Sequence, residues 1–212
     1  MTLSPERIDR PVSAPDRITV ARIVLAPIFF VLFFVDRVFQ GAGLVSVVGV
    51  WIVFLLAELS DALDGLIARR LGKESERGKL LDPYADSVSR LTYFICFSAV
   101  SIMPVWALLL VVYRDLSVAF IRVLLSRNGV VLGARLSGKV KAFVYAVAGA
   151  AGIVLFSLRK LLILPEESPM LTILPNAVFG LCGLIAVWSL IDYAWSSCRR
   201  IRAEGIGPKN SQ

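Results

Sequence analysis

The sequence has no histidine, only three cysteines, and few charged residues, which make up 18% of its 212 positions. Without histidine, catalytic triads and metal sites built on imidazole are excluded, and any acid or base must be a carboxylate, lysine, tyrosine or water. Cys96 and Cys182 lie within apolar runs and Cys198 follows one. They form no CxxC pair and no metal-ligand spacing, so we interpret them as packing residues.

Hydrophobic residues are abundant instead, at 57% of the chain, and the mean hydropathy is +0.76. That composition is too apolar for a soluble domain and indicates a polytopic membrane protein. A transmembrane helix needs roughly 20 mostly apolar residues, and Pro and Gly near positions 40–43, 103–104 and 164–169 separate the apolar runs. The sequence predicts an all-α bundle of six transmembrane helices, at about 18–39, 43–68, 80–102, 104–126, 138–158 and 174–195.

The basic residues predict the orientation in the membrane. The net charge is +7. We attribute this excess to Lys and Arg residues that flank the helices and contact anionic lipid headgroups, so no nucleic-acid partner is expected. The polar first twenty residues do not resemble a removable signal peptide. We expect a multi-pass protein of the cytoplasmic membrane with both termini in the cytoplasm. The basic residues of the second-to-third connection, on the predicted cytoplasmic side, are Arg69, Arg70, Lys73, Arg77 and Lys79, and those of the opposite side are Arg37, Arg159 and Lys160.

Four aspartates stand where the second and third apolar runs meet, in DALDGLIARRLGKESERGKLLDPYAD at 61–86. Asp61 and Asp64 are three apart and Asp82 and Asp86 four apart, so each pair lies on one face of its helix. Antiparallel helices joined by a short turn would bring the four carboxylates together, where they repel one another unless cations lie between them. Carboxylate oxygens suit Mg²⁺, Mn²⁺ or Ca²⁺, and two such ions can clamp a pyrophosphate.

The neighbouring residues favour a phosphate-bearing ligand. Gly65 and Gly78 let a ligand approach the backbone, Ala68 keeps the helix face shallow, and Arg69 offers a fork of donors to phosphate. The alternative is that the carboxylates merely snorkel at two helix ends and pair with nearby basic residues. Because carboxylates at the edge of a membrane are costly, four on two matched faces favour a functional site.

The spacing Asp61-x2-Asp64-Gly65-x2-Ala68-Arg69-x8-Gly78-x3-Asp82-x3-Asp86 resembles the signature of the CDP-alcohol phosphatidyltransferase family, with every defined position filled. The resemblance implies a membrane enzyme that transfers a phosphatidyl group from a CDP-linked lipid, usually CDP-diacylglycerol, to the hydroxyl of an alcohol and releases CMP. It assigns residues 18–198 to the membrane domain, after an N-terminal segment 1–17 and before a tail 199–212. It also makes a homodimer an expectation.

The resemblance implies a role for each matched residue. Asp86 is expected to act as general base and, with Asp61, Asp64 and Asp82, to hold one or two divalent ions, Mg²⁺ or Mn²⁺. Gly65, Ala68, Arg69 and Gly78 are expected to line the site of the CDP lipid.

The acceptor alcohol is indicated by residues outside this stretch. Arg114 and Asp115 interrupt the fourth apolar run, and Lys139 follows Gly138 at the start of the fifth. These segments resemble the bacterial phosphatidylglycerophosphate synthases of the family, although Asp115, Ser87 and Ala142 depart from their usual residues. The resemblance implies sn-glycerol 3-phosphate as acceptor, bound by Arg22, Arg114, Lys139 and Arg122. Arg122, Arg127, Arg135 and Lys141 are each interpreted singly as ordinary flanking charges.

Other functions remain open from the residues alone. An inositol-type acceptor would also need basic residues here. An ion or metal transporter would place carboxylates deep in several spans, and a prenyl-diphosphate enzyme would pack its aspartates as DDxxD in two copies. The aspartates instead gather at the ends of two helices, which favours the transferase.

Overall fold

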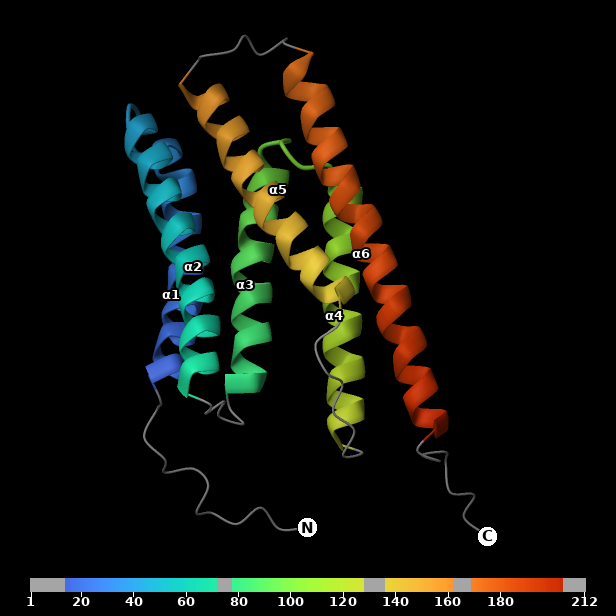
Figure 1. The fold of residues 1–212 in the computed structure, drawn as a ribbon. Coiled ribbons are helices and arrows are strands. Elements are labelled where there is room, and N and C mark those ends of the chain that lie inside the picture. The colour runs from blue at the N-terminus through green and yellow to red at the C-terminus, as the bar shows by residue number, and fades with distance from the viewer. Residues whose placement is uncertain (1–13, 72–77, 128–135, 162–168, 204–212) are drawn as a thin grey trace. The chain divides into compact units, whose positions relative to one another are not determined.

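The computed structural model describes residues 14–71, 78–127, 136–161 and 169–203; within these, the side chains of 14–18, 61–71, 78–82 and several helix-end residues are outside the description. This part of the chain forms six α-helices and no strand (Figure 1). The predicted all-α class is confirmed, and each predicted span overlaps one helix. The helices are α1 (Ala14–Val38), α2 (Gly43–Leu71), α3 (Gly78–Ala99), α4 (Val105–Arg127), α5 (Leu136–Lys160) and α6 (Met170–Ala203).

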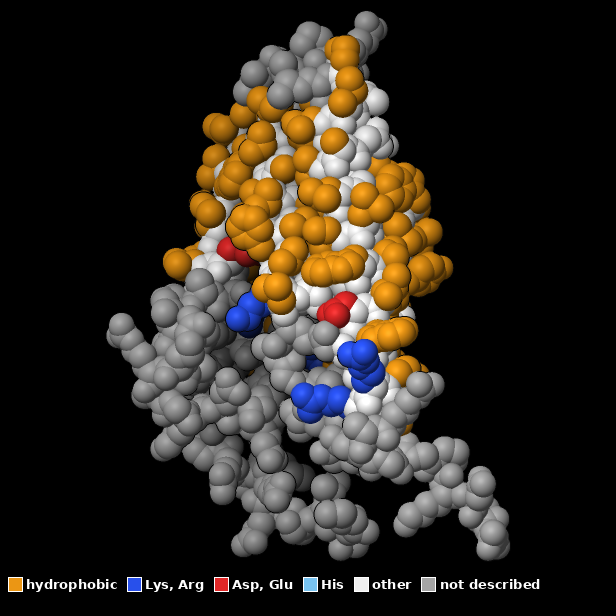
Figure 2. Space-filling view, turned by 45° about the vertical axis from the view of Figure 1, so that its right-hand side comes forward, with side chains coloured by type: hydrophobic (Ala, Val, Ile, Leu, Met, Phe, Trp, Pro, Cys, Tyr) orange, Lys and Arg blue, Asp and Glu red, His pale blue; other side chains and the backbone are white. Residues whose placement is uncertain are grey.

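Four of the described helices contain stretches that are long and apolar enough to cross a membrane, and they lie in α1, α2, α5 and α6. Helix α4 is interrupted by Arg114, Asp115 and Arg122, which lower its apolar character. Hydrophobic side chains cover much of the visible surface of the helices (Figure 2), and Phe143 and Leu184 are each 70% exposed. Large apolar side chains facing outward all along a helix are typical of contact with lipid. The chain is a multi-pass helical membrane protein.

The chain divides into two compact units, residues 1–92 and 93–212. In the first unit, α1 packs along α2 around buried aromatic side chains such as Phe29, Phe33 and Phe54. The buried hydroxyl of Ser46 donates to the backbone oxygen of Phe33 at 3.3 Å and ties the two helices together. The predicted break between them falls at Gly41, whose φ of +91° is a conformation that glycine adopts without strain.

In the second unit, α4 and α5 each pack against α6. Phe94 and Phe97, from the end of α3, contact Phe179 of α6 with ring centroids 5.9 and 6.1 Å apart. Helix α5 approaches closely because Gly152 has no side chain: a Cβ there would lie 2.4 Å from the Phe97 ring. This packing fixes the facing sides of α4, α5 and α6, on which the buried Arg114, Asp115 and Lys141 lie.

Candidate functional site

The described parts of the aspartate stretch, 61–71 and 78–86, are helical, as the spacing predicts. Helix α2 continues through Asp61 and Asp64 to Leu71, and α3 begins at Gly78 and includes Asp82 and Asp86. The side chains of most predicted donor-site residues lie outside the described part, so their convergence stays a prediction. These residues are Asp61, Asp64, Gly65, Ala68, Arg69, Gly78 and Asp82.

Of the four aspartates predicted to bind metal, Asp86 is the one whose side chain the structure describes. An arginine contacts each of its two carboxylate oxygens. Arg22 Nη1 of α1 lies 3.0 Å from Oδ1, and Arg90 Nη1 lies 3.0 Å from Oδ2. The two arginine side chains are 2% and 10% exposed, whereas that of Asp86 is 29% exposed. The carboxylate is therefore fixed in orientation from the protein side and still reachable from outside.

Arg22 reaches Asp86 because α1 and α3 touch at this level. The hydroxyl of Ser89 on α3 donates to the backbone oxygen of Arg22 at 3.4 Å. From the sequence, Arg22 was predicted to bind an acceptor phosphate rather than Asp86. Arg90 was not predicted, although a basic residue four positions after an aspartate on a helix is a recognisable pairing signal.

Divalent-metal chemistry fits the donor set of this stretch, because carboxylate oxygens are the ligands that Mg²⁺ and Mn²⁺ prefer. Among the side chains that the structure describes, no three His, Cys, Asp or Glu gather into a group able to hold a metal ion. Three of the four aspartates belong to the part whose side chains are not described. Asp86 has a partly exposed carboxylate and could therefore serve as one ligand in such a metal site.

A second charged cluster lies within the other unit, where α4, α5 and α6 meet. Arg114 Nη1 and Lys141 Nζ both contact Oδ1 of Asp115, at 2.9 and 2.7 Å. Arg114 Nη2 donates to the Ser189 hydroxyl of α6 at 2.9 Å. The ammonium of Lys141 also lies 4.8 Å from the centre of the Tyr145 ring. All of these side chains are buried, and two of the described cations meet the same carboxylate oxygen.

Lys141 was interpreted from the sequence as an ordinary flanking charge, and that interpretation is wrong. Its side chain is 7% exposed and forms part of the buried cluster, because the packing of α5 turns it inward toward Asp115. Lys139, two residues earlier, is exposed, and Arg122 on α4 is half-buried. Neither forms an ion pair with any residue that the structure describes. The structure therefore groups Arg114 with Lys141, and Arg22 with Asp86.

A hydrogen bond joins the beginning of α5 to the C-terminal half of α6. The hydroxyl of Ser137, in the first turn of α5, donates to Oδ2 of Asp192 on α6 at 2.5 Å. Ser137 is buried and Asp192 is half-buried. This bond fixes the start of α5, and with it the position of Lys139 and Lys141, against α6.

Comparison with known proteins gives a family for this arrangement. The family model described as CDP-alcohol phosphatidyltransferase matches residues 12–189. A CDP-diacylglycerol–glycerol-3-phosphate 3-phosphatidyltransferase of Treponema pallidum is 37% identical over 149 residues, 68% of this chain and 67% of the relative. A probable phosphatidylglycerophosphate synthase of Mycobacterium tuberculosis is 33% identical over 186 residues, 87% of this chain and 81% of the relative. A Bacillus subtilis protein with the same name as that of Treponema is 31% identical over 143 residues, 65% of this chain and 74% of the relative.

The charge balance of the second cluster makes a prediction about stability. Asp115→Asn leaves two buried cations without their carboxylate, and we expect it to lower the free energy of unfolding by about 3–5 kcal/mol. Lys141→Met keeps the Arg114–Asp115 pair, so its cost should stay below about 2 kcal/mol. The double variant should be more stable than Asp115→Asn alone, as measured by denaturant unfolding in detergent. Losses that simply add would contradict this account of the cluster.

Proposed function

The chain belongs to the CDP-alcohol phosphatidyltransferase family, and we propose that it transfers the phosphatidyl group of CDP-diacylglycerol to sn-glycerol 3-phosphate. The products are CMP and phosphatidylglycerophosphate. The observation that carries the proposal is the match of the family model to residues 12–189, together with relatives at 31–37% identity that are named for this reaction. The complete aspartate signature of the chain supports the same chemistry.

Asp86 is the proposed general base. Arg22 and Arg90 hold its carboxylate in one orientation, and its partial exposure leaves it reachable by an acceptor. Asp86 takes the proton of the acceptor hydroxyl while the oxygen of that hydroxyl bonds to the β-phosphorus. The bond from the β-phosphorus to the bridging oxygen breaks, and CMP leaves with the electron pair on its phosphate.

The donor lipid is proposed to bind on the aspartate stretch. Asp61, Asp64 and Asp82 join Asp86 in holding Mg²⁺ or Mn²⁺, which when bound offsets the charge that develops on the pyrophosphate. Gly65 and Gly78 let the CDP group approach the helix backbone, beside Ala68. Arg69 offers its guanidinium to a phosphate.

The acceptor phosphate is proposed to bind Arg22, Arg114, Arg122 and Lys139. Arg114 belongs to a buried cluster in which two cations share one carboxylate oxygen, and buried cations favour an anionic ligand over a neutral one. Arg122 and Lys139 carry charges that no described carboxylate neutralises. Arg22 is included because it contacts Asp86, the proposed base for the acceptor hydroxyl. These cations favour a phosphorylated alcohol over inositol or serine.

The positive-inside distribution of Lys and Arg supports an orientation with both termini and the site in the cytoplasm. CDP-linked lipids and glycerol phosphate would then reach the site from the cytoplasmic side. Assembly as a homodimer is proposed from the family resemblance.

The activity itself gives the first test. Purified protein supplied with CDP-diacylglycerol and Mg²⁺ or Mn²⁺ should release CMP with sn-glycerol 3-phosphate and much less with inositol 3-phosphate, inositol or serine. Asp86→Asn should abolish release yet still bind the CDP lipid, because the amide cannot take the proton. No CMP release with any of the four alcohols would refute the enzyme proposal, and full activity of Asp86→Asn would remove Asp86 from the mechanism.

The acceptor site gives a second test. Arg122→Gln and Lys139→Gln should each raise the KM for sn-glycerol 3-phosphate by about tenfold, because each removes a charge-assisted contact of about 1.5 kcal/mol. The KM for CDP-diacylglycerol should change little. Arg37→Gln, which removes a cation in the last turn of α1, is the matched control and should leave both constants unchanged. Unchanged KM values in both test variants would exclude these residues from the acceptor site.

A further inference from the structure

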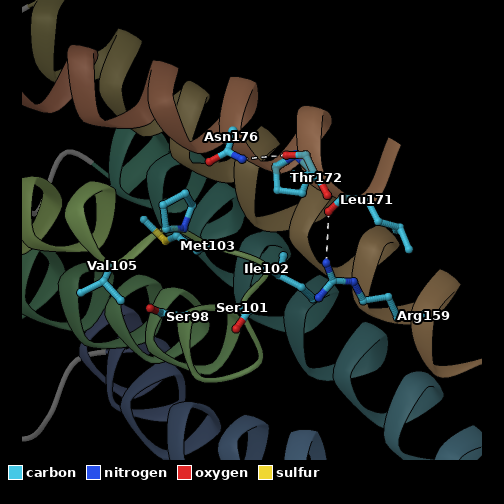
Figure 3. A pocket seen from close by; sticks show the side chains of 11 residues that line it. Ser98, Ser101, Ile102, Met103, Val105, Arg159, Leu171, Thr172 and Asn176 are labelled. Carbon is cyan, nitrogen blue, oxygen red and sulfur yellow. Dashed lines mark hydrogen bonds between the residues drawn. The ribbon is translucent and has the colours of Figure 1, made fainter. Parts of the chain in front are cut away.

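A pocket of about 310 Å³ opens in the second unit, at the end where α3 gives way to α4 and α5 gives way to α6 (Figure 3). Asp86 and the predicted donor site belong to the beginning of α3, whereas this pocket lies beyond its end, around Ser98 and Ser101. The volume is at the lower end of the range for small-molecule sites, which is about 300–1,000 Å³. The reaction proposed above does not use any residue that lines it.

Arg159 provides the charge of this pocket and bridges two helix ends. Its Nη1 donates to the backbone oxygen of Val100, just after α3, at 3.1 Å, and its Nη2 donates to the backbone oxygen of Leu171, in α6, at 3.1 Å. The Leu171 oxygen lacks its helical partner because Pro175, four residues later, has no N–H. Arg159 therefore stabilises the walls of the pocket, and this explains why its guanidinium is held there.

These two hydrogen bonds do not neutralise the charge of Arg159. Two carbonyls occupy two of the five N–H donors of the guanidinium, and they carry no charge. Of the lining residues, all of which the structure describes, none is an Asp or Glu. Arg159 thus presents an ionic charge and further donors in a half-buried place, where an anion is bound more strongly than in open water.

Ser101 indicates that the lining is built for a polar ligand. Its φ is +56°, a left-handed conformation that costs a residue other than glycine about 1 kcal/mol or more. Glycine is the usual residue at such a helix end, where the N–H of Ile102 returns to the oxygen of Phe97 at 2.8 Å. Ser101 lines the pocket, and its side chain offers a hydroxyl that glycine lacks. Ser98, Thr172 and Asn176 add further hydrogen-bonding groups around it (Figure 3).

The other wall of the pocket is apolar, and it includes Ile102, Met103 and Val105. A pocket with one polar side that carries a cation and one apolar side fits an amphiphilic ligand better than a free ion. Arg159 also lies in the last turn of α5, at the end of a stretch long enough to span the membrane, where lipid headgroups are found.

We propose that this pocket binds the phosphate group of an anionic membrane phospholipid, with Arg159 and the Ser101 hydroxyl on the phosphate and the Ile102, Met103 and Val105 side on the adjoining glycerol and acyl carbons. None of its lining residues belongs to the aspartate stretch, and the site does not depend on the proposed transferase activity.

Binding of lipids to the purified full chain in detergent tests the proposal, with native mass spectrometry as the measurement. Wild-type protein should retain phosphatidylglycerol in preference to phosphatidylcholine. Arg159→Gln should weaken the retention of phosphatidylglycerol about tenfold. Lys160→Gln, which removes the neighbouring cation outside the pocket, is the matched control and should retain the wild-type preference.

Ser101→Gly is the second variant, because glycine relieves the left-handed conformation and keeps the helix end folded even if Arg159→Gln does not fold. It should weaken the retention of phosphatidylglycerol about fivefold while leaving the melting temperature unchanged or higher. Sodium phosphate should not compete at concentrations equal to those of the lipid. Equal retention of both lipids by the wild type, unchanged retention in Ser101→Gly, or full competition by inorganic phosphate would overturn the proposal.

Discussion

A carboxylate inside a membrane protein is stable only when cations or hydrogen-bond donors surround it, and both units of this chain meet that requirement with two cations for one carboxylate. Asp86 lies between Arg22 and Arg90, and Asp115 receives Arg114 and Lys141. These pairs draw α1 to α3 in one unit and α4 to α5 in the other, and Ser189 adds α6. The helices can then cover their charges and still present apolar side chains to lipid.

Under the proposed function, the same pairing would prepare the residues for chemistry on phosphates. A carboxylate with a guanidinium on each oxygen keeps one orientation, as a base that must meet an incoming hydroxyl requires. The arginines and the lysine of these clusters favour ligands that bring negative charge, and both proposed substrates carry phosphate. Charges that would only destabilise a membrane bundle thereby become useful when the substrates are a nucleotide-linked lipid and a phosphorylated alcohol.

Much of this was predictable from the sequence, because apolar runs of membrane length and their Pro and Gly boundaries define the helices directly. The place of Asp86 on a helix was predictable from its spacing, and Arg90 could have been found from its position one helical turn later. Lys141 was not predictable, since flanking and buried lysines look alike until α5 is packed against its neighbours. Ser189 is 75 residues from Arg114 in sequence, and Arg159 has its place because Pro175 frees a carbonyl on another helix. Such contacts depend on tertiary packing rather than on local pattern.

The central claim is that a hydroxyl of sn-glycerol 3-phosphate attacks the β-phosphorus of CDP-diacylglycerol. Acceptor labelled with a heavy oxygen isotope in its hydroxyl groups tests it most directly, when the lipid product and CMP are analysed by mass spectrometry after one round of reaction. The account predicts that the lipid product contains the label together with a second phosphate, and that CMP contains none. Label in CMP, or label that remains wholly in the water-soluble acceptor while CMP is released, would contradict it.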